Sequence, residues 1–165
     1  MLGQDRTGDR VLDLFAGAGS LGIEAASRGA TRVVFVEQSR AHARVLAANA
    51  ALLDGLAEVV VRTADARKVL AGLAAAGERF DLVLLDPPYG RGLATEALSA
   101  LAEVAERLLE QTATVVVETD GRDALPERLG ALVRSGPRRY GATEIWLYRA
   151  DPDSTRAASS PREDA

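Results

Sequence analysis

The chain has 165 residues, of which 47% are hydrophobic and 27% charged, a balance typical of one globular domain. Its net charge of −4 argues against bulk electrostatic wrapping of nucleic acid, although a local basic patch stays open. The absence of cysteine excludes disulfides and thiolate metal sites. The one histidine, His42, lies in a helical pattern and is expected to be solvated or packed rather than catalytic. No apolar stretch has the length of a membrane span and the N-terminus is polar, so we expect a cytoplasmic protein.

Strands and helices alternate along the chain, which predicts a sheet covered by helices on both faces. The expected parallel strands are residues 11–15, 32–36, 58–62, 80–85 and 114–118. The expected helices are residues 20–28, 40–53, 66–76, 95–109 and 123–129. Residues 131–135 and 144–149 are expected to form an antiparallel hairpin around Gly136-Pro137. The predicted fold is therefore α/β: a doubly wound, mostly parallel seven-stranded sheet with an antiparallel C-terminal strand.

The composition along the chain also predicts its domain organisation. We expect residues 1–9 to form a short N-terminal lead and residues 10–150 to form a single globular domain. From Asp151 onward the chain turns to Asp, Ser, Pro, Ala and Arg, so residues 151–165 are expected to be a disordered tail.

A glycine-rich loop follows the first expected strand. Gly17, Gly19 and Gly22 match the G-x-G-x-x-G spacing between a strand and a helix, where backbone amides approach a ligand closely. Glu37 ends the second strand, where an acid can bind both hydroxyls of a ribose. These residues predict a nucleoside-containing cofactor, whereas the glycines alone would also suit a tight strand-to-helix turn.

Two further acids favour S-adenosylmethionine over a nicotinamide dinucleotide. Asp13 lies inside the first strand, where a buried carboxylate needs an amine or a loop amide as its partner. An amino-acid ammonium suits Asp13, whereas a pyrophosphate would be repelled. Asp65 follows the third strand, where it accepts from an adenine amine or caps the next helix, and the two roles are compatible.

The segment Asp86-Pro87-Pro88-Tyr89 ends the fourth strand. Its prolines fix two φ angles and supply no N–H donors, so backbone carbonyls and the Asp86 carboxylate are left as acceptors for a planar amine. Tyr89 offers a face on which a base can stack. A plain loop with a surface tyrosine is the alternative. In a doubly wound sheet the fourth strand lies beside the first, so this turn and the glycine loop are expected to flank one crevice.

Other polar residues are candidates for the rim of this crevice. Arg91 follows the turn, and Glu118 ends the fifth strand. Arg134, Arg138 and Arg139 cluster near the C-terminal end of the domain. The arginines could contact phosphates beside the site, and a solvated position suits each of them equally well.

Five segments together carry a family resemblance. They are Val11 to Ala25, Phe35-Val36-Glu37, Asp65, Asp86 to Tyr89, and Glu144 to Tyr148. The chain resembles the bacterial 16S ribosomal RNA guanine-N2 methyltransferase family over roughly residues 10–149. The resemblance implies a Rossmann-like class I methyltransferase fold, S-adenosylmethionine as cofactor, and a guanine in 16S rRNA or the small ribosomal subunit as acceptor. The cofactor site is expected to contain Asp13, Phe15, Gly17, Gly19, Glu37, Asp65 and Ala66.

The expected reaction is direct methyl transfer, with Asp86, Pro87, Pro88 and Tyr89 as the catalytic turn. Asp86 and the Pro87 carbonyl are expected to accept the two hydrogens of the guanine amine, which fixes the nitrogen. Tyr89 stacks on the base, which must be reached outside a helical stack.

One departure from the family concerns the N-terminus. Its members usually carry a longer segment, rich in arginine and glycine, that helps hold RNA, whereas nine residues precede the first expected strand here. Either the start is truncated or the protein docks its substrate differently. The alternatives are another amine acceptor, such as nucleic-acid adenine or protein glutamine, a nicotinamide-dependent oxidoreductase, or a cofactor-binding module that needs a partner. A monomer is expected.

Overall fold

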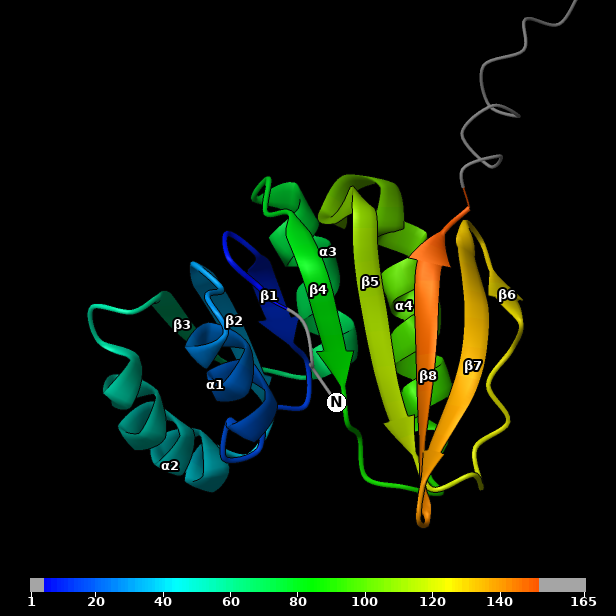
Figure 1. The fold of residues 1–165 in the computed structure, drawn as a ribbon, viewed down its shortest axis with the longest axis horizontal. Helices are drawn as coiled ribbons and strands as arrows, with labels where there is room; N and C mark the ends of the chain where they lie inside the picture. The colour runs from blue at the N-terminus through cyan, green and yellow to red at the C-terminus, as the bar shows by residue number, and fades with distance from the viewer. Residues whose placement is uncertain (1–4, 152–165) are drawn as a thin grey trace, which may run out of the picture.

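The computed structural model describes residues 5–151; the predicted tail beyond Asp151 lies outside the described residues. Eight strands form one sheet (Figure 1). Their bounds are β1 Arg10–Asp13, β2 Arg32–Glu37, β3 Glu58–Thr63, β4 Phe80–Leu85, β5 Leu109–Thr119, β6 Arg128–Leu129, β7 Leu132–Tyr140 and β8 Thr143–Ala150. The helices are α1 Ser20–Ser27, α2 Arg40–Ala50, the 3-10 turn η1 Ala51–Leu53, α3 Ala66–Ala75 and α4 Leu93–Leu108.

The strand order is β3-β2-β1-β4-β5-β8-β7-β6, and β1 to β5 are parallel to their neighbours within this group. The chain runs outward from β1 to β3 and then crosses to β4, which pairs with β1 through Asp13 and Leu84. The predicted adjacency of the first and fourth strands is therefore confirmed. The loops that follow β1 and β4 leave the same edge of the sheet side by side, which is where open α/β sheets bind ligands.

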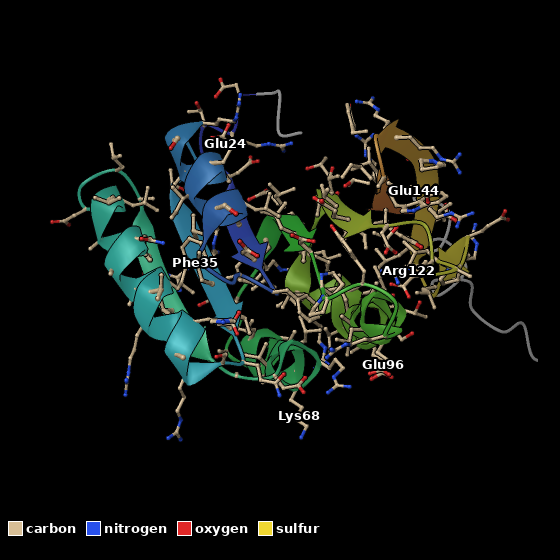
Figure 2. The ribbon with its side chains drawn as sticks, turned by 90° about the horizontal axis from the view of Figure 1, so that it is seen from below. Glu24, Phe35, Lys68, Glu96, Arg122 and Glu144 are labelled. Atoms are coloured by element: carbon tan, nitrogen blue, oxygen red, sulfur yellow. The ribbon has the colours of Figure 1, made fainter. Side chains whose placement is uncertain are left out.

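The core has one layer on each face of the sheet because successive strand residues point to opposite sides. Leu12 and Val34 pack with α3 and α4 on one face. Val11, Val33 and Phe35 pack with α1, α2 and η1 on the other. Figure 2, which views the molecule from below, shows α3 and α4 side by side on one side of the sheet. The prediction of a sheet covered on both faces is confirmed.

The predicted helix at residues 123–129 is wrong. The segment is irregular and ends in the two-residue strand β6, which pairs with β7 and brings the sheet to eight strands rather than seven. Pro126 has no N–H to donate to a helix. The carbonyl of Leu125 accepts from the Arg134 guanidinium, and the carbonyl of Pro126 accepts from the Tyr148 hydroxyl at 2.6 Å. Side chains of β7 and β8 therefore bind the carbonyls that a helix would have used.

The C-terminal hairpin exists, but its turn is not at Gly136-Pro137. Strand β7 continues through this pair to Tyr140, with a register shift between Ser135 and Arg138, and the turn lies at residues 141–142. Gly136 has a φ of +107°, and a Cβ there would lie 3.3 Å from the Ile145 carbonyl. A glycine in this conformation and a proline without a donor are typical of a β-bulge, which explains why the pair resembled a turn.

Smaller differences concern element ends. Strand β1 ends at Asp13, and α2 ends at Ala50 with the 3-10 turn after it. Strand β5 starts directly after α4, at Leu109, because its first residues continue the pairing with β4 across an irregularity. Asp151, the first residue of the predicted tail, donates its N–H to the Ala131 carbonyl at 2.7 Å. No described helix has both the length and the apolar character of a membrane span.

Candidate active site

A pocket of about 860 Å³ opens at the carboxyl ends of the parallel strands. Figure 2 looks onto this edge of the molecule. The loops after β1 and β4 both line this pocket, as the adjacency of the two strands predicted. The predicted cofactor residues in its wall are Phe15, Gly17, Glu37, Asp65 and Ala66, and the predicted acceptor residues are Asp86, Pro87, Pro88 and Tyr89.

The glycine loop takes the conformation that its residues permit. Gly17 has a φ of +53° and Gly19, the N-cap of α1, a φ of +93°, both in the left-handed region that favours glycine. A Cβ on Gly19 would lie 2.6 Å from Cδ1 of Leu46, and one on Gly22 would lie 2.3 Å from the Phe35 ring. Gly17 therefore shapes the pocket wall, whereas Gly19 and Gly22 let α1 pack closely against its neighbours.

Glu37 accepts hydrogen bonds from the backbone of two loops that line the pocket. Its Oε2 accepts from the Gly17 N–H at 2.9 Å, and its Oε1 accepts from the Ser39 N–H at 2.7 Å. The exposed His42 lies nearby, with Nδ1 3.8 Å from Oε1 of Glu37. The carboxylate that ends β2 thus fixes the glycine loop and still faces the pocket, because each oxygen has a second lone pair for a ligand hydroxyl.

Asp13 lies beneath the pocket rather than in its wall. The residue is 1% exposed, and its Oδ2 accepts from the Gly22 N–H at 3.0 Å, while Oδ1 has no hydrogen-bond partner. The pKa of Asp13 is raised to about 7, mainly by burial and to a smaller extent by the nearby carboxylates of Asp86 and Glu37, while the hydrogen bond from Gly22 lowers it. Of the two predicted partners, an amine or a loop amide, the structure provides the amide.

Asp65 is both a helix cap and a pocket residue, and the sequence analysis found these two roles compatible. It is the N-cap of α3, where Oδ1 accepts from the Arg67 N–H at 2.9 Å, and it also lines the pocket. The Arg67 guanidinium binds the same carboxylate and lowers the pKa of Asp65 to about 2. Asp65 is therefore ionised at any physiological pH, which makes it an acceptor and not a donor at this wall of the pocket.

The turn after β4 presents its acidic and aromatic side chains to the pocket. Asp86 is half-buried, and this burial together with the charge of Glu118 raises its pKa to about 6. The Tyr89 hydroxyl donates to Oε1 of Glu118 at 3.1 Å. Glu118 is thus a support for the turn, because it lies outside the pocket wall and bonds a residue within it.

Sequence reasoning missed several pocket residues. Gln38 and Ser39 follow Glu37 directly, so their position after a strand end was the available signal. Arg67 and Leu93 lie in the first turns of α3 and α4, and no local pattern marks them. Asp13 and Gly19 are the two predicted cofactor residues that do not line the pocket.

The three C-terminal arginines have different partners. Arg134 lies over the Trp146 ring, 4.2 Å from its centroid, and is partly buried. Arg139 pairs with Glu144 at 2.8 Å, whereas Arg138 and Arg91 are exposed and form no ion pair with any described residue. Within residues 5–151 no group of three His, Cys, Asp or Glu side chains has the arrangement of a metal site.

The sheet order, the glycine loop and the acids at the strand ends together define a Rossmann-like methyltransferase. Two solved methylases share the fold at 21% and 18% identity, each with a TM-score of 0.63 over 87% of this chain, a likeness that concerns the fold alone. The chain belongs to the "Conserved hypothetical protein 95" family, whose model matches residues 1–149. The family resemblance drawn from the sequence is confirmed.

Named relatives agree with this assignment. The Bacillus subtilis protein named "Putative rRNA methyltransferase YlbH" is 34% identical over 149 residues, which are 90% of this chain and 80% of that protein. The Escherichia coli "Ribosomal RNA small subunit methyltransferase D" is 37% identical over 116 residues, 70% of this chain and 55% of that protein. A solved conserved hypothetical protein from Streptococcus pyogenes is 35% identical, with a TM-score of 0.74 over 86% of each chain.

Proposed function

We propose that this protein transfers a methyl group from S-adenosylmethionine to the exocyclic amine, N2, of a guanine in 16S ribosomal RNA. The observation that carries the proposal is the shared pocket, with the Gly17 and Glu37 loops on one side and the Asp86 turn on the other. Residues 10–150 are proposed to be the methyltransferase domain. The names of the curated relatives support ribosomal RNA as the substrate.

The chemistry of the pocket suits S-adenosylmethionine. Its described wall contains the carboxylates of Glu37, Asp65 and Asp86, which match a ligand with hydroxyls, an adenine amine and positive charge. The three carboxylates outnumber the two arginines of the wall, Arg91 and Arg67, of which Arg67 already pairs with Asp65, and this disfavours the pyrophosphate of a nicotinamide dinucleotide. Glu37 would accept from the ribose hydroxyls and Asp65 from the adenine side, while Phe15 supplies apolar surface. When bound, this cofactor supplies an electrophilic methyl group.

Asp86 and Pro87 would hold the acceptor amine. A guanine amine is a weak nucleophile because its lone pair is delocalised into the ring. The amine donates one hydrogen bond to the ionised Asp86 and one to the Pro87 carbonyl, which orients the nitrogen and localises its lone pair. Positioning of this kind lowers the activation barrier by up to about 7–11 kcal/mol. Pro88 holds the turn rigid and Tyr89 stacks on the base. Because Asp86 has a pKa near 6, it is mostly ionised at pH 7.

Replacement of Asp86 by asparagine tests the chemistry. We expect Asp86→Asn to bind S-adenosylhomocysteine with the wild-type Kd and to lose at least about 100-fold in kcat, because one acceptor oxygen becomes an amide donor. Asp81→Asn is the control, since Asp81 lies at the start of β4, the strand that ends just before Asp86, and accepts from the Arg10 N–H. Retained turnover in Asp86→Asn would exclude Asp86 as the amine acceptor.

A comparison of substrates tests the target. Purified small ribosomal subunits, naked 16S rRNA, duplex DNA and a glutamine-containing protein are offered with labelled S-adenosylmethionine, and the modified base is identified after digestion. We expect label on a guanine N2 in ribosomal RNA. Label on adenine or on glutamine would replace the proposed acceptor while leaving the cofactor site in place. Binding of NADH in preference to S-adenosylhomocysteine would overturn the methyl-transfer proposal.

A further inference from the structure

Exposed charges are unevenly distributed over the two edges of the sheet. Within residues 5–151, the exposed cations without an ion pair are Arg40, Arg44, Arg62, Lys68, Arg91, Arg107, Arg138 and Arg149. Most of them lie at or near the carboxyl edge, where α2, α3 and α4 begin and β3 ends. The exposed carboxylates without an ion pair in the same range are Asp5, Asp54, Glu103 and Glu106.

These four carboxylates lie away from the pocket. Asp5 precedes β1 and Asp54 follows η1, so both are at the amino edge of the sheet, and Glu103 and Glu106 are in the second half of α4. A chain with a net charge of −4 therefore presents its unpaired cations mainly on the edge that carries the pocket. Such an arrangement attracts a polyanion to this edge and orients it there.

The β7–β8 hairpin extends this edge beyond the parallel strands. Thr119, the last residue of β5, pairs with Glu144, so the hairpin tip, residues 138–142, begins level with Glu118 and runs past the end of β5 from Tyr140 on. Figure 1 shows the tip of this hairpin projecting below the ends of β4 and β5. The tip carries Arg138, which is exposed and without an ion pair, and Tyr140, which is 60% exposed.

The tip is close to the acceptor side of the pocket. Glu118, which binds the Tyr89 hydroxyl, pairs with Ile145 of β8. The loop after β5 fills the space between turn and hairpin: a Cβ on Gly90 would lie 3.5 Å from the Arg122 guanidinium, and one on Gly121 would lie 3.3 Å from the Glu144 carboxyl. Arg122 and Glu144 lie near one another on this side in Figure 2. A nucleic acid whose base enters the pocket past Tyr89 would therefore meet the hairpin.

We propose that the β7–β8 hairpin tip is the docking element for the RNA strand next to the target base, and this rests on the proposed function. Arg138 binds a phosphate and Tyr140 stacks on an unpaired neighbouring base. RNA fits this surface because single-stranded nucleic acid is bound by cations that follow its backbone and by aromatic rings that accept any base. A protein partner fits less well, since one tyrosine that follows two arginines offers little apolar surface to bury.

The test uses the full chain with the double variant Arg138→Ala/Tyr140→Ala. We expect KM for ribosomal RNA to rise about tenfold or more and kcat to stay within about twofold, because neither side chain touches the reacting atoms. The plot of log affinity against log salt should become shallower by about one unit, as one phosphate contact is lost. Arg149→Ala is the matched control, because Arg149 is also exposed and without an ion pair and lies at the end of β8 away from the hairpin tip.

The melting temperature and the Kd for S-adenosylhomocysteine verify that the double variant is folded. Equal KM values and salt slopes for the double variant and Arg149→Ala would overturn the proposal. A change of sedimentation coefficient in the double variant alone would also overturn it, because a second copy of the chain would then be the occupant of the hairpin.

If the wild type binds S-adenosylhomocysteine but methylates no RNA, the proposed function fails. Binding of a single-stranded RNA oligonucleotide then tests the docking role of the hairpin separately. Weaker binding by the double variant than by Arg149→Ala supports the docking role, and equal binding removes it.

Discussion

The Tyr89 hydroxyl donates a 3.1 Å hydrogen bond to Oε1 of Glu118, which joins the turn after β4 to the end of β5. Both residues act on Asp86: burial first and then the charge of Glu118 raise its pKa to about 6, whereas the Tyr89 hydroxyl lowers it. Burial and the charges of Asp86 and Glu118 raise the pKa of Tyr89 to about 12, so the phenol stays protonated as a donor. The pKa of the proposed amine acceptor thus depends on its burial and on two identifiable neighbours.

The pH profile of methyl transfer should respond to these neighbours in opposite directions. Asp86 must be ionised to accept from an amine, so activity should fall as the pH drops through about 6. Glu118→Gln removes the charge that raises the pKa of Asp86, so the acid limb of kcat/KM should move to lower pH. Tyr89→Phe removes the hydroxyl that lowers this pKa, so the limb should move to higher pH. The measurement is single-turnover methyl transfer between pH 5 and 8.

Melting temperatures at each pH separate this effect from unfolding. Arg149→Ala is the control: Arg149 lies at the end of β8 that is far from Glu118, so this substitution should leave the acid limb of the pH profile in place. A limb that moves in the same direction in Glu118→Gln and Tyr89→Phe would contradict the assignment.

Much of the site could be predicted because its residues follow local rules. Three local patterns each indicate a position in a doubly wound sheet: a glycine loop after a strand, an acid at the end of the next strand, and an Asp-Pro-Pro-Tyr turn. The crossover rule then put the first and fourth strands together, and the pairing of Asp13 with Leu84 confirmed it.

The features that could not be predicted depend on contacts between distant segments. Residues 123–129 have a helical composition, but Arg134 and Tyr148 bind the carbonyls of Leu125 and Pro126. The Glu118–Tyr89 bond joins residues 29 positions apart, so no spacing rule indicates it. The sequence showed that the Asp13 carboxylate needs a hydrogen-bond donor, but it could not tell whether that donor is a ligand amine or a loop amide; in the structure it is the Gly22 N–H.

Asp13 should make stability depend on pH. Its pKa is about 7 in the folded protein and about 3.8 in the unfolded chain, so the unfolded state loses its proton first. The free energy of unfolding should therefore decrease as the pH rises from about 4 to 7. Asp13→Asn keeps an oxygen for the Gly22 N–H without ionising, so between pH 4.5 and 8 it should gain about 3 kcal/mol relative to wild type. Urea unfolding at several pH values measures this difference.

The exposed Asp54→Asn provides the control for the stability experiment, because it removes a carboxylate from the surface. A stability difference between Asp13→Asn and wild type that is constant with pH would mean that Asp13 is ionised throughout the range.

Gly22 and Gly72 should respond oppositely to alanine. A Cβ on Gly22 would lie 2.3 Å from the Phe35 ring, so α1 must move away from β2, and we expect a loss of about 1–3 kcal/mol. Gly72 lies inside α3, and a Cβ there would meet no atom of a neighbouring segment within 4 Å, so alanine should stabilise by about 0.5–1 kcal/mol. Denaturant titration measures both. Equal effects of the two substitutions would show that close packing of α1 is not what requires Gly22.

Glu37 should be the most sensitive position for cofactor binding. Its two oxygens accept from the Gly17 and Ser39 amides, and a glutamine can offer only one acceptor oxygen to these two donors. Bonds to a charged group contribute about 1.5–3 kcal/mol each, so Glu37→Gln should raise the Kd for S-adenosylhomocysteine at least about tenfold. Glu24→Gln is the control, because Glu24 pairs with Arg28 on the exposed face of α1. Isothermal titration of both variants decides the point: a Kd for Glu37→Gln within twofold of the Glu24→Gln value would place the ribose hydroxyls on another residue of the pocket.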